Sequence, residues 1–251
     1  VACLVGSEMC IRDSKNLNVD LTELYCDVDG TFPNHHPDPT VESNLTDLIK
    51  AMKTGNYDVG IAFDGDADRV GVVDETGVVV WADQLMALFL PELVSPGDEI
   101  LFDVKCSKAL EEMITRYQGK PVMWKTGHSL IKQKMIEHNC KFGGEMSGHI
   151  FFADDYYGYD DAIYVAARLL QTLSNSKKTL SQLTAELPKY FSTPEIRLEA
   201  NSDEEKFKIS KKAVEYFSSN FDCLTIDGVR INFDDGWGPV SYTHLTLPTT
   251  R

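Results

Sequence analysis

Apolar and polar positions along the chain form blocks whose period changes repeatedly from strand-like to helix-like. The short apolar runs at 57–63 and 70–74 predict two buried strands on either side of an acidic stretch. Between 98 and 176, strand-like and helix-like blocks follow one another, which predicts an α/β region with a largely parallel sheet. We expect strands at 98–105, 121–127 and both ends of 141–152, and helices at 84–94, 107–118, 128–139 and 160–176.

The pattern is less regular in the first third of the chain. Residues 16–40 combine a short helical pattern with a loop rich in proline and histidine, which we interpret as a rigid frame for the acidic stretch. Residues 42–56 predict a helix capped by Ser43 or Asn44. Residues 77–84 extend the strand pattern.

The last third predicts a separate, smaller unit. Prolines interrupt the pattern, so we expect a domain boundary near 187–194. A capped amphipathic helix at 202–219 and a hairpin at 221–238 should follow. Residues 1–14 and 239–251 do not continue the pattern. We expect that they are not native and that the chain is a gene fragment.

Composition and charge limit the classes of molecule that the protein is expected to bind. The 251 residues are 43% hydrophobic and 25% charged, as in an ordinary globular protein, and the net charge is −15. This charge argues against nucleic acid and an anionic membrane surface, but not against a phosphorylated metabolite held by local cations or a metal. No apolar stretch approaches the roughly 20 residues of a membrane span. The six scattered cysteines argue against zinc and fit a reducing cytosol, so we expect a cytoplasmic protein.

Three aspartates at alternate positions, Asp64, Asp66 and Asp68, separate the two strands at 57–63 and 70–74. In an extended chain their side chains would point to one face and converge on one point. Mg²⁺ takes such hard oxygen ligands, so the spacing predicts a metal site. A solvated acidic turn is the alternative. Arg69 cannot bind metal and would contact a phosphate or orient an acid, unless it only forms an ion pair with Asp68 or Asp74.

Further polar residues follow the expected strands of the central region, where ligands of parallel sheets gather. Lys105 ends one strand, and His128 opens a helix after Gly127, an arrangement that favours a phosphate. Glu145 and Ser147 lie two residues apart in a glycine-rich loop and suit two adjacent hydroxyls. Each has a structural alternative, a surface lysine or a turn-stabilising hydroxyl. His149 could transfer a proton, although a lone histidine is more often structural.

The chain resembles the α-D-phosphohexomutases. The stretch DGDADR (64–69) resembles their metal-binding loop, and GEMSGH (144–149) resembles their sugar-binding loop. The stretches VDGTFPNHHPDP (28–39) and VMWKTGHSLIK (122–132) are similar to the phosphomannomutase/phosphoglucomutase branch. The resemblance covers roughly residues 15–238, and the two loops in this order are highly specific together.

The resemblance implies a Mg²⁺-dependent transfer of a phosphoryl group between the 1- and 6-positions of mannose or glucose phosphate, through a 1,6-bisphosphate. It implies that Asp64, Asp66 and Asp68 bind metal and that Arg69 and His149 are catalytic. Lys105, Gly127, His128, Glu145, Ser147 and His149 would bind substrate, with Glu145 and Ser147 on the 3- and 4-hydroxyls.

The family has four domains, and the resemblance assigns parts of three to this chain. We expect the end of the second at 15–78, the third at 79–188 and part of the fourth at 189–238. We find no match to the family's Ser-His-Asn phosphoserine loop or to its Arg-x-Ser-Asn-Thr phosphate loop. The fragment alone should therefore be inactive.

Three alternatives remain open at this point. The glucosamine-phosphate branch tends to carry Gln where this chain has Met146, which favours mannose or glucose phosphates. A phosphatase of the haloacid dehalogenase type would leave Asp68 and the GEMSGH loop without a role. A non-catalytic metal-binding module of the EF-hand kind needs Gly where Arg69 stands.

Overall fold

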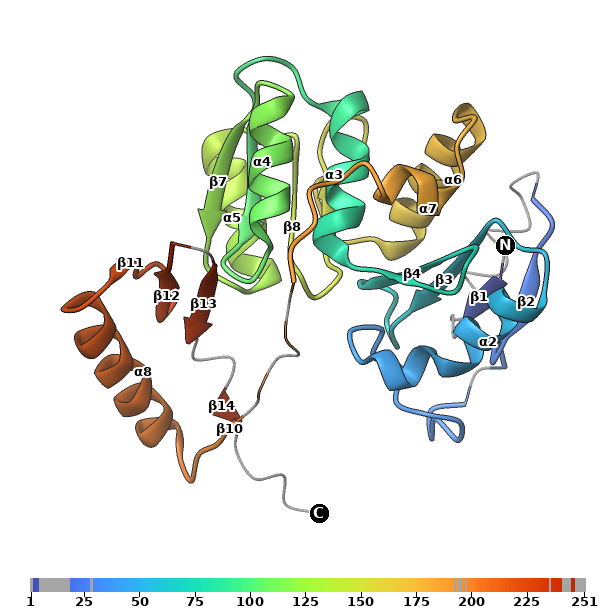
Figure 1. The fold of residues 1–251 in the computed structure, drawn as a ribbon. Coiled ribbons are helices and arrows are strands. Elements are labelled where there is room, and N and C mark those ends of the chain that lie inside the picture. Colours follow the sequence, from blue (N-terminus) through green and yellow to red (C-terminus); the bar gives the residue numbers. More distant parts are fainter. Residues whose placement is uncertain are drawn as a thin grey trace.

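The computed structural model describes residues 2–4, 19–27, 29–191, 193, 196, 198–234, 236–240 and 245–246. Its main part consists of two sheets with helices between and around them, followed by a smaller C-terminal segment (Figure 1). This mixed α/β architecture confirms the predicted fold class. No helix within the described residues is long and apolar enough to cross a membrane.

The first sheet has the order β2-β1-β3-β4-β5. Strands β2, β1 and β3 run parallel, and β3, β4 and β5 run antiparallel. Leu48 and Met52 of helix α2 pack against one face of this sheet, where Ala62 and Val73 point. The elements are β1 (Ala2–Leu4), β2 (Thr22–Leu24), the 3₁₀ helix η1 (Glu42–Leu45), α2 (Thr46–Thr54), β3 (Val59–Phe63), β4 (Val70–Asp74) and β5 (Val79–Val80).

The second sheet has the order β7-β6-β8-β9, in which only β9 runs antiparallel to its neighbour. Alternate residues of β6 point to opposite faces, as the pleat of a strand requires. The elements are α3 (Ala82–Leu93), β6 (Glu99–Asp103), α4 (Lys108–Arg116), β7 (Lys120–Trp124), α5 (His128–His138), β8 (Phe142–Gly144), β9 (Ile150–Phe152), α6 (Ala162–Asn175) and α7 (Leu180–Thr184).

One apolar core joins the two sheets. Ile61 and Val72 of the first sheet belong to the same buried cluster as Phe102 and Phe142 of the second, with α3 and α6 between them. The rings of Phe89, Phe142 and Phe152 pack at centroid distances of 4.9–6.2 Å. On the other face of the second sheet, α5 forms a smaller cluster with Leu101 and Phe151. This shared core fixes the acidic loop after β3 relative to the glycine-rich loop after β8.

The C-terminal segment contains helix α8 and an antiparallel sheet of the order β11-β12-β13. Ser202 caps α8 through a bond from the Glu205 amide, as the sequence predicts. The segment's elements are β10 (Leu198–Glu199), α8 (Asp203–Ser218), β11 (Asp222–Leu224), β12 (Val229–Asn232), β13 (Trp237–Val240) and β14 (Leu245–Thr246).

Four local predictions are wrong. Within 16–40, residues Thr22–Leu24 form a strand instead of a helix, because they pair with β1. Ser43 and Asn44 lie inside η1 instead of capping α2. The strand expected at 77–84 ends at Val80, and α3 begins at Ala82, where the Gln84 side chain accepts a hydrogen bond from the Trp81 amide. The hairpin expected at 221–238 is a meander of three strands.

The predicted domain limits remain predictions. Part of the segment 1–14 forms β1, which pairs in parallel between β2 and β3. The rest of that segment, 5–14, and residues 241–244 and 247–251 of the tail lie outside the described residues.

Candidate functional site

The acidic loop joins the antiparallel strands β3 and β4. Asp64 is 2% exposed, and its Oδ1 accepts hydrogen bonds from the amides of Asp68 (3.0 Å) and Arg69 (3.1 Å). The loop is a turn and not the extended chain that the sequence predicts, because Ala67 adopts a left-handed φ of 60°. The carboxylates converge nonetheless: one oxygen from each of Asp64, Asp66 and Asp68 lies within 4.8 Å of the others.

Arg69 is held by two carboxylates. Its Nε lies 2.7 Å from Asp64 Oδ2, and its Nη1 lies 3.1 Å from Asp38 Oδ1. The Nε of Arg69 lies farther, 4.0 Å, from Asp68 Oδ1. The alternative in which Arg69 forms an ion pair with Asp68 or Asp74 is therefore met only in part, because Asp64 and Asp38 are its main partners. Asp38 comes from the proline-rich segment, whose Pro39 packs on Gly71 of β4. The prediction that this segment frames the acidic loop agrees with these contacts.

The aspartate loop fits a hard divalent cation. Asp68 Oδ1 is buried and has no hydrogen-bond partner within the described part of the chain. Burial raises the pKa of Asp68 to about 6; the charges of Asp64 and Asp66 act in the same direction, and His149 opposes them. Three clustered carboxylates that repel one another in this way provide the donor set that Mg²⁺ prefers.

The glycine-rich loop packs directly on the aspartate loop. The amide of Val70 donates to the carbonyl of Gly148 at 3.2 Å, and the amide of Ala162 donates to the carbonyl of Ala67 at 3.0 Å. A Cβ on Gly148 would lie 2.7 Å from the carbonyl oxygen of Val70, and Gly148 has a φ of 100°. Only glycine therefore allows the two loops to meet.

We expect Gly148→Ala to lower the free energy of unfolding by about 3 kcal/mol, since left-handed strain and a backbone clash add together. Gly97→Ala is the matched control, because Gly97 has a similar φ of 91° but open space around its Cβ position. It should cost about 1 kcal/mol. Urea unfolding of both variants checks this. Equal losses would show that no clash occurs at Gly148.

Two histidines from different elements stack beside the aspartate loop. The rings of His128, the first residue of α5, and His149 lie 5.1 Å apart at 17°. Both Nδ1 atoms approach Asp160 Oδ2, at 2.9 Å and 3.2 Å. The Nδ1 of His149 also lies 3.6 Å from Asp68 Oδ1. Lys132, one turn after His128, places its Nζ 2.7 Å from Asp160 Oδ1.

These contacts shift the pKa values of His149 and Asp160. Burial disfavours the charged imidazolium, but Asp160, Asp68 and Glu145 outweigh it and raise the pKa of His149. Burial acts to raise the pKa of Asp160, but its contacts with His149 and Lys132 overcome it and lower this pKa well below its usual range.

Two buried carboxylates, Glu145 and Asp103, connect the loops of the second sheet by hydrogen bonds. Glu145 is 2% exposed and accepts a hydrogen bond from the amide of Gly127, the N-cap of α5. Asp103 is fully buried and accepts from the Met146 amide at 3.2 Å. Burial raises the pKa of Glu145, and the charge of Asp103 adds to this, whereas the Gly127 amide, His149 and Lys105 oppose it. The predicted residues Lys105, Gly127, Glu145 and His149 therefore share one site.

Lys105 lies in the turn after β6, two residues beyond its last residue, Asp103, and not in the strand itself. Ser147 lies half-buried at the tip of the glycine-rich loop. The structure thus brings the predicted metal loop, sugar loop and α5 start together.

The C-terminal segment forms hydrogen bonds to the turn that carries Lys105 and to the loop before α5. Arg230 of β12 is 3% exposed and donates from Nη1 to the carbonyls of Val104 (2.6 Å) and Cys106 (3.0 Å), which flank Lys105. Its guanidinium lies 3.7 Å from the centre of the Trp237 ring. The amide of Thr126 donates to Asp227 Oδ2 at 3.2 Å.

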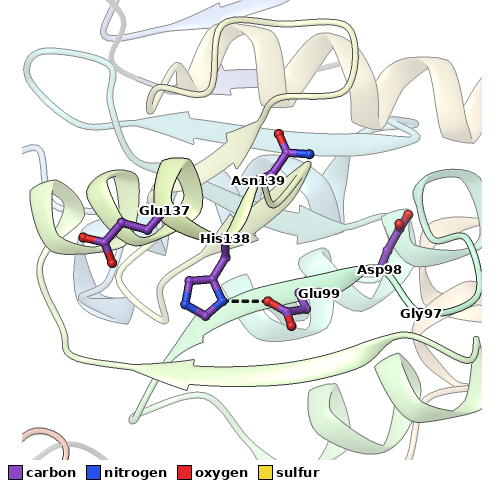
Figure 2. A pocket seen from close by; sticks show the side chains of 6 residues that line it. All are labelled: Gly97, Asp98, Glu99, Glu137, His138 and Asn139. Atoms are coloured by element: carbon purple, nitrogen blue, oxygen red, sulfur yellow. Dashed lines mark hydrogen bonds and ion pairs between the residues drawn. The ribbon is translucent and has the colours of Figure 1, made fainter.

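A surface hollow of about 460 Å³ lies at the other end of the second sheet (Figure 2). Its lining includes Glu99, the first residue of β6, and His138, the last residue of α5, whose Nδ1 lies 2.7 Å from Glu99. The predicted site residues lie at the opposite end of these elements. Lys105 follows the carboxyl end of β6, and Gly127 precedes α5. We assign the site to the clustered loops and not to this hollow, because the converging carboxylates and histidines lie in the loops.

Sequence reasoning missed Asp160, Lys132 and Asp103. Asp160 was hidden in the stretch DDYYGYDD, whose aromatic residues indicate packing. Lys132 carried a usable signal, since it lies four residues after His128 on the same helix face. Asp103 follows a run of apolar residues, and an acid that ends a buried strand is a candidate for a site.

Two parts of the chain match one known family. The phosphoglucomutase/phosphomannomutase α/β/α domain II matches residues 5–77, and α/β/α domain III of the same family matches residues 81–191. This protein belongs to the α-D-phosphohexomutase family. Membership excludes the haloacid dehalogenase and EF-hand alternatives.

Relatives and a solved structure agree with this assignment. The chain is 47% identical over 235 residues to the phosphomannomutase/phosphoglucomutase of Pseudomonas aeruginosa, covering 92% of this chain and 50% of that protein. It is 42% identical over 248 residues to a phosphoglucomutase of Neisseria meningitidis, covering 96% and 53%. A crystal structure of a phosphoglucomutase/phosphomannomutase family protein from Burkholderia thailandensis superposes with a TM-score of 0.83 at 38% identity, covering 94% and 52%. The chain spans about half the length of the curated relatives it matches.

Proposed function

We propose that this chain is the metal-binding and sugar-binding part of a Mg²⁺-dependent phosphohexomutase, which interconverts hexose 1-phosphates and hexose 6-phosphates. The contact between the aspartate loop and the glycine-rich loop carries this proposal. The Val70 amide donates to the Gly148 carbonyl, and His149 approaches Asp68. The proposed cation site and the proposed hydroxyl-binding site are therefore adjacent. Phosphoryl transfer depends mainly on positioning and charge neutralisation, which this arrangement supplies.

Asp64, Asp66 and Asp68 would hold Mg²⁺ in this proposal, since their oxygens converge and Asp68 Oδ1 lacks a protein partner within the described residues. When bound, the ion supplies positive charge to a phosphoryl group. Arg69 fixes the loop through Asp64 and Asp38 and presents its remaining guanidinium edge to a phosphate.

The sugar would bind across the glycine-rich loop. We assign Glu145 and Ser147 to two adjacent ring hydroxyls, and Lys105, Gly127 and His128 to the phosphate end at the start of α5. His149 would exchange a proton with a sugar hydroxyl, since its paired carboxylates keep the ring in place.

Mannose and glucose phosphates are the proposed substrates, with a 1,6-bisphosphate as the intermediate. The names of the Pseudomonas and Neisseria relatives support this choice over glucosamine phosphate, as does Met146 in the sugar loop. We propose a cytoplasmic location as well, because Cys26, Cys106, Cys140 and Cys223 are free thiols.

We expect Asp66→Asn to weaken Mg²⁺ binding to this chain by about tenfold or more, because it removes one carboxylate of the set. Asp66 is exposed, so the fold should not change. Isothermal titration with MgCl₂ measures the effect. Asp155→Asn, an exposed acid outside the set, controls for the lost charge. Equal weakening by both variants would indicate general electrostatic attraction instead of a bound ion.

The activity itself is tested on the full-length protein encoded by the same source DNA. With Mg²⁺ and glucose 1,6-bisphosphate present, it should convert mannose 1-phosphate and glucose 1-phosphate into the 6-phosphates in a coupled dehydrogenase assay. Absence of conversion of both sugars by a folded, Mg²⁺-binding protein would contradict the proposed reaction.

A further inference from the structure

Two histidines and two carboxylates converge beside the proposed Mg²⁺ loop. One donor atom each from Asp68, His128, His149 and Asp160 lies within 4.8 Å of the other three. These residues come from the turn after β3, the start of α5, the loop before β9 and the loop before α6. The cluster is therefore assembled by the fold and not by one local acidic stretch.

Three separations within this cluster are close to those between donors in a tetrahedral metal site. Zinc bonds of about 2.0–2.2 Å to nitrogen and oxygen place neighbouring tetrahedral donors roughly 3.3–3.5 Å apart. The two histidine Nδ1 atoms lie 2.9 Å and 3.2 Å from Asp160 Oδ2, and His149 Nδ1 lies 3.6 Å from Asp68 Oδ1. Rotation of the side chains, including a turn of one histidine ring out of the stacked pair, would bring the donors to tetrahedral separations.

Two buried atoms of the cluster lack good partners. Within the described part of the chain, His149 Nδ1 and Asp68 Oδ1 are buried and form no hydrogen bond of good geometry, although His149 Nδ1 lies in ion-pair range of Asp160 and Asp68. Buried polar atoms without a partner are costly, so their presence here needs an explanation. A bound cation would satisfy both atoms at once.

We propose that Asp68, His128, His149 and Asp160 form a zinc site, which adjoins the three-aspartate Mg²⁺ loop and shares Asp68 with it. Imidazole nitrogen favours Zn²⁺, whereas an all-carboxylate set favours Mg²⁺. The spacing of the cysteines gave no zinc signal, and this site uses none of them. The His128 side chain is 47% exposed, which gives the ion a path from solvent.

Binding of zinc has a direct consequence for the neighbouring loop. Asp68 belongs to both groups, so an ion at the histidines competes for its carboxylate and adds a positive charge beside the aspartates. Zinc therefore weakens Mg²⁺ binding, and the site acts as an inhibitory one. Lys132 now donates to Asp160 Oδ1 and must turn toward solvent when the ion enters. The site rests on this cluster alone and does not require the proposed mutase activity.

Metal titration of the 251-residue chain tests the proposal. Isothermal titration with ZnCl₂ should give one equivalent, and Co²⁺ at the same site should show the intense visible bands of tetrahedral cobalt. Asp160→Asn and His128→Gln should each weaken Zn²⁺ binding by roughly 10- to 100-fold. Because His128 is partly exposed, His128→Gln keeps the test valid if Asp160→Asn fails to fold.

Two matched variants separate the zinc site from other sites. His138→Gln removes another histidine that is paired with a carboxylate, Glu99, at the far end of the sheet (Figure 2), and should not affect zinc. Asp66→Asn should weaken Mg²⁺ binding but leave Zn²⁺ binding unchanged. The proposal is overturned if the wild-type chain binds no zinc, or if cobalt gives only weak octahedral bands. It is also overturned if Asp66→Asn or His138→Gln weakens zinc as much as His128→Gln does.

Discussion

If the proposed role of Glu145 holds, Glu145→Gln in the full-length protein should lower kcat/KM by roughly 100- to 1000-fold, because it removes about 3–4 kcal/mol of charge-assisted hydrogen bonding to the two hydroxyls of the proposed sugar substrate. Glutamine keeps the shape of the side chain and can still accept the Gly127 amide, so the loop before α5 should remain in place. Unlike the carboxylate, its amide nitrogen donates and cannot accept from a hydroxyl. A coupled assay of the initial rate measures the loss.

The size of the loss should be the same for mannose and glucose phosphates. These sugars differ only at carbon 2, and Glu145 is assigned to the 3- and 4-hydroxyls, which they share. Glu137→Gln is the control, since Glu137 lies on the exposed side of α5 and pairs with Lys134. A loss that differs strongly between the two sugars would place Glu145 at carbon 2 and contradict the assignment.

The fold was predictable from the sequence wherever the apolar residues of a strand or helix follow the period of that element. Strands β3, β4 and β6 are continuous apolar runs because both of their faces are covered, by α2 and the common core or by α5 and the common core. Strand β2 was not predictable, since Thr22–Leu24 has no apolar period and forms through pairing with β1. The helix start at Ala82 is marked by a hydrogen bond from the Trp81 amide to Gln84, a signal that the preceding strand-like run of valines obscured.

The site was predictable where its residues are neighbours in sequence. Asp64, Asp66 and Asp68 form a visible pattern, although the left-handed turn at Ala67, and not an extended chain, brings them together. Asp160 was not predictable, because its role depends on two histidines that precede it by 32 and 11 residues in sequence. Asp38 was likewise recognisable only as part of a rigid segment, since its partner Arg69 lies 31 residues away.

Arg230 is a buried cation whose hydrogen bonds, in the described part of the chain, go to carbonyl oxygens and not to a carboxylate. Burial lowers the pKa of its guanidinium, although arginine stays protonated in proteins. Its Nη1 is shared by the carbonyls of Val104 and Cys106, so it fixes the turn that carries Lys105. The face of Trp237 compensates part of the lost hydration. The C-terminal segment is thereby coupled to the turn after β6 and to the loop before α5.

We expect Arg230→Ala to destabilise the chain by about 2–4 kcal/mol, because two buried carbonyls lose charge-assisted bonds and the Trp237 ring loses its cation. Amide hydrogen exchange should accelerate in 104–106 and at Thr126, which Asp227 of the same segment contacts. Urea unfolding and hydrogen exchange measure the two effects. Arg116→Ala, in the last turn of α4, serves as a control for loss of an arginine.

Arg230→Met decides whether the charge or the packing matters at this position. Methionine can still cover Trp237 but cannot bond to the carbonyls of Val104 and Cys106. Replacing a buried charge by an apolar side chain of similar size is often neutral or stabilising, so unchanged stability alone would not decide the question. If Arg230 positions the turn, exchange at 104–106 must accelerate in Arg230→Met even when global stability is kept. Unchanged exchange there would mean that Arg230 contributes packing only, and that Lys105 is held by the second sheet itself.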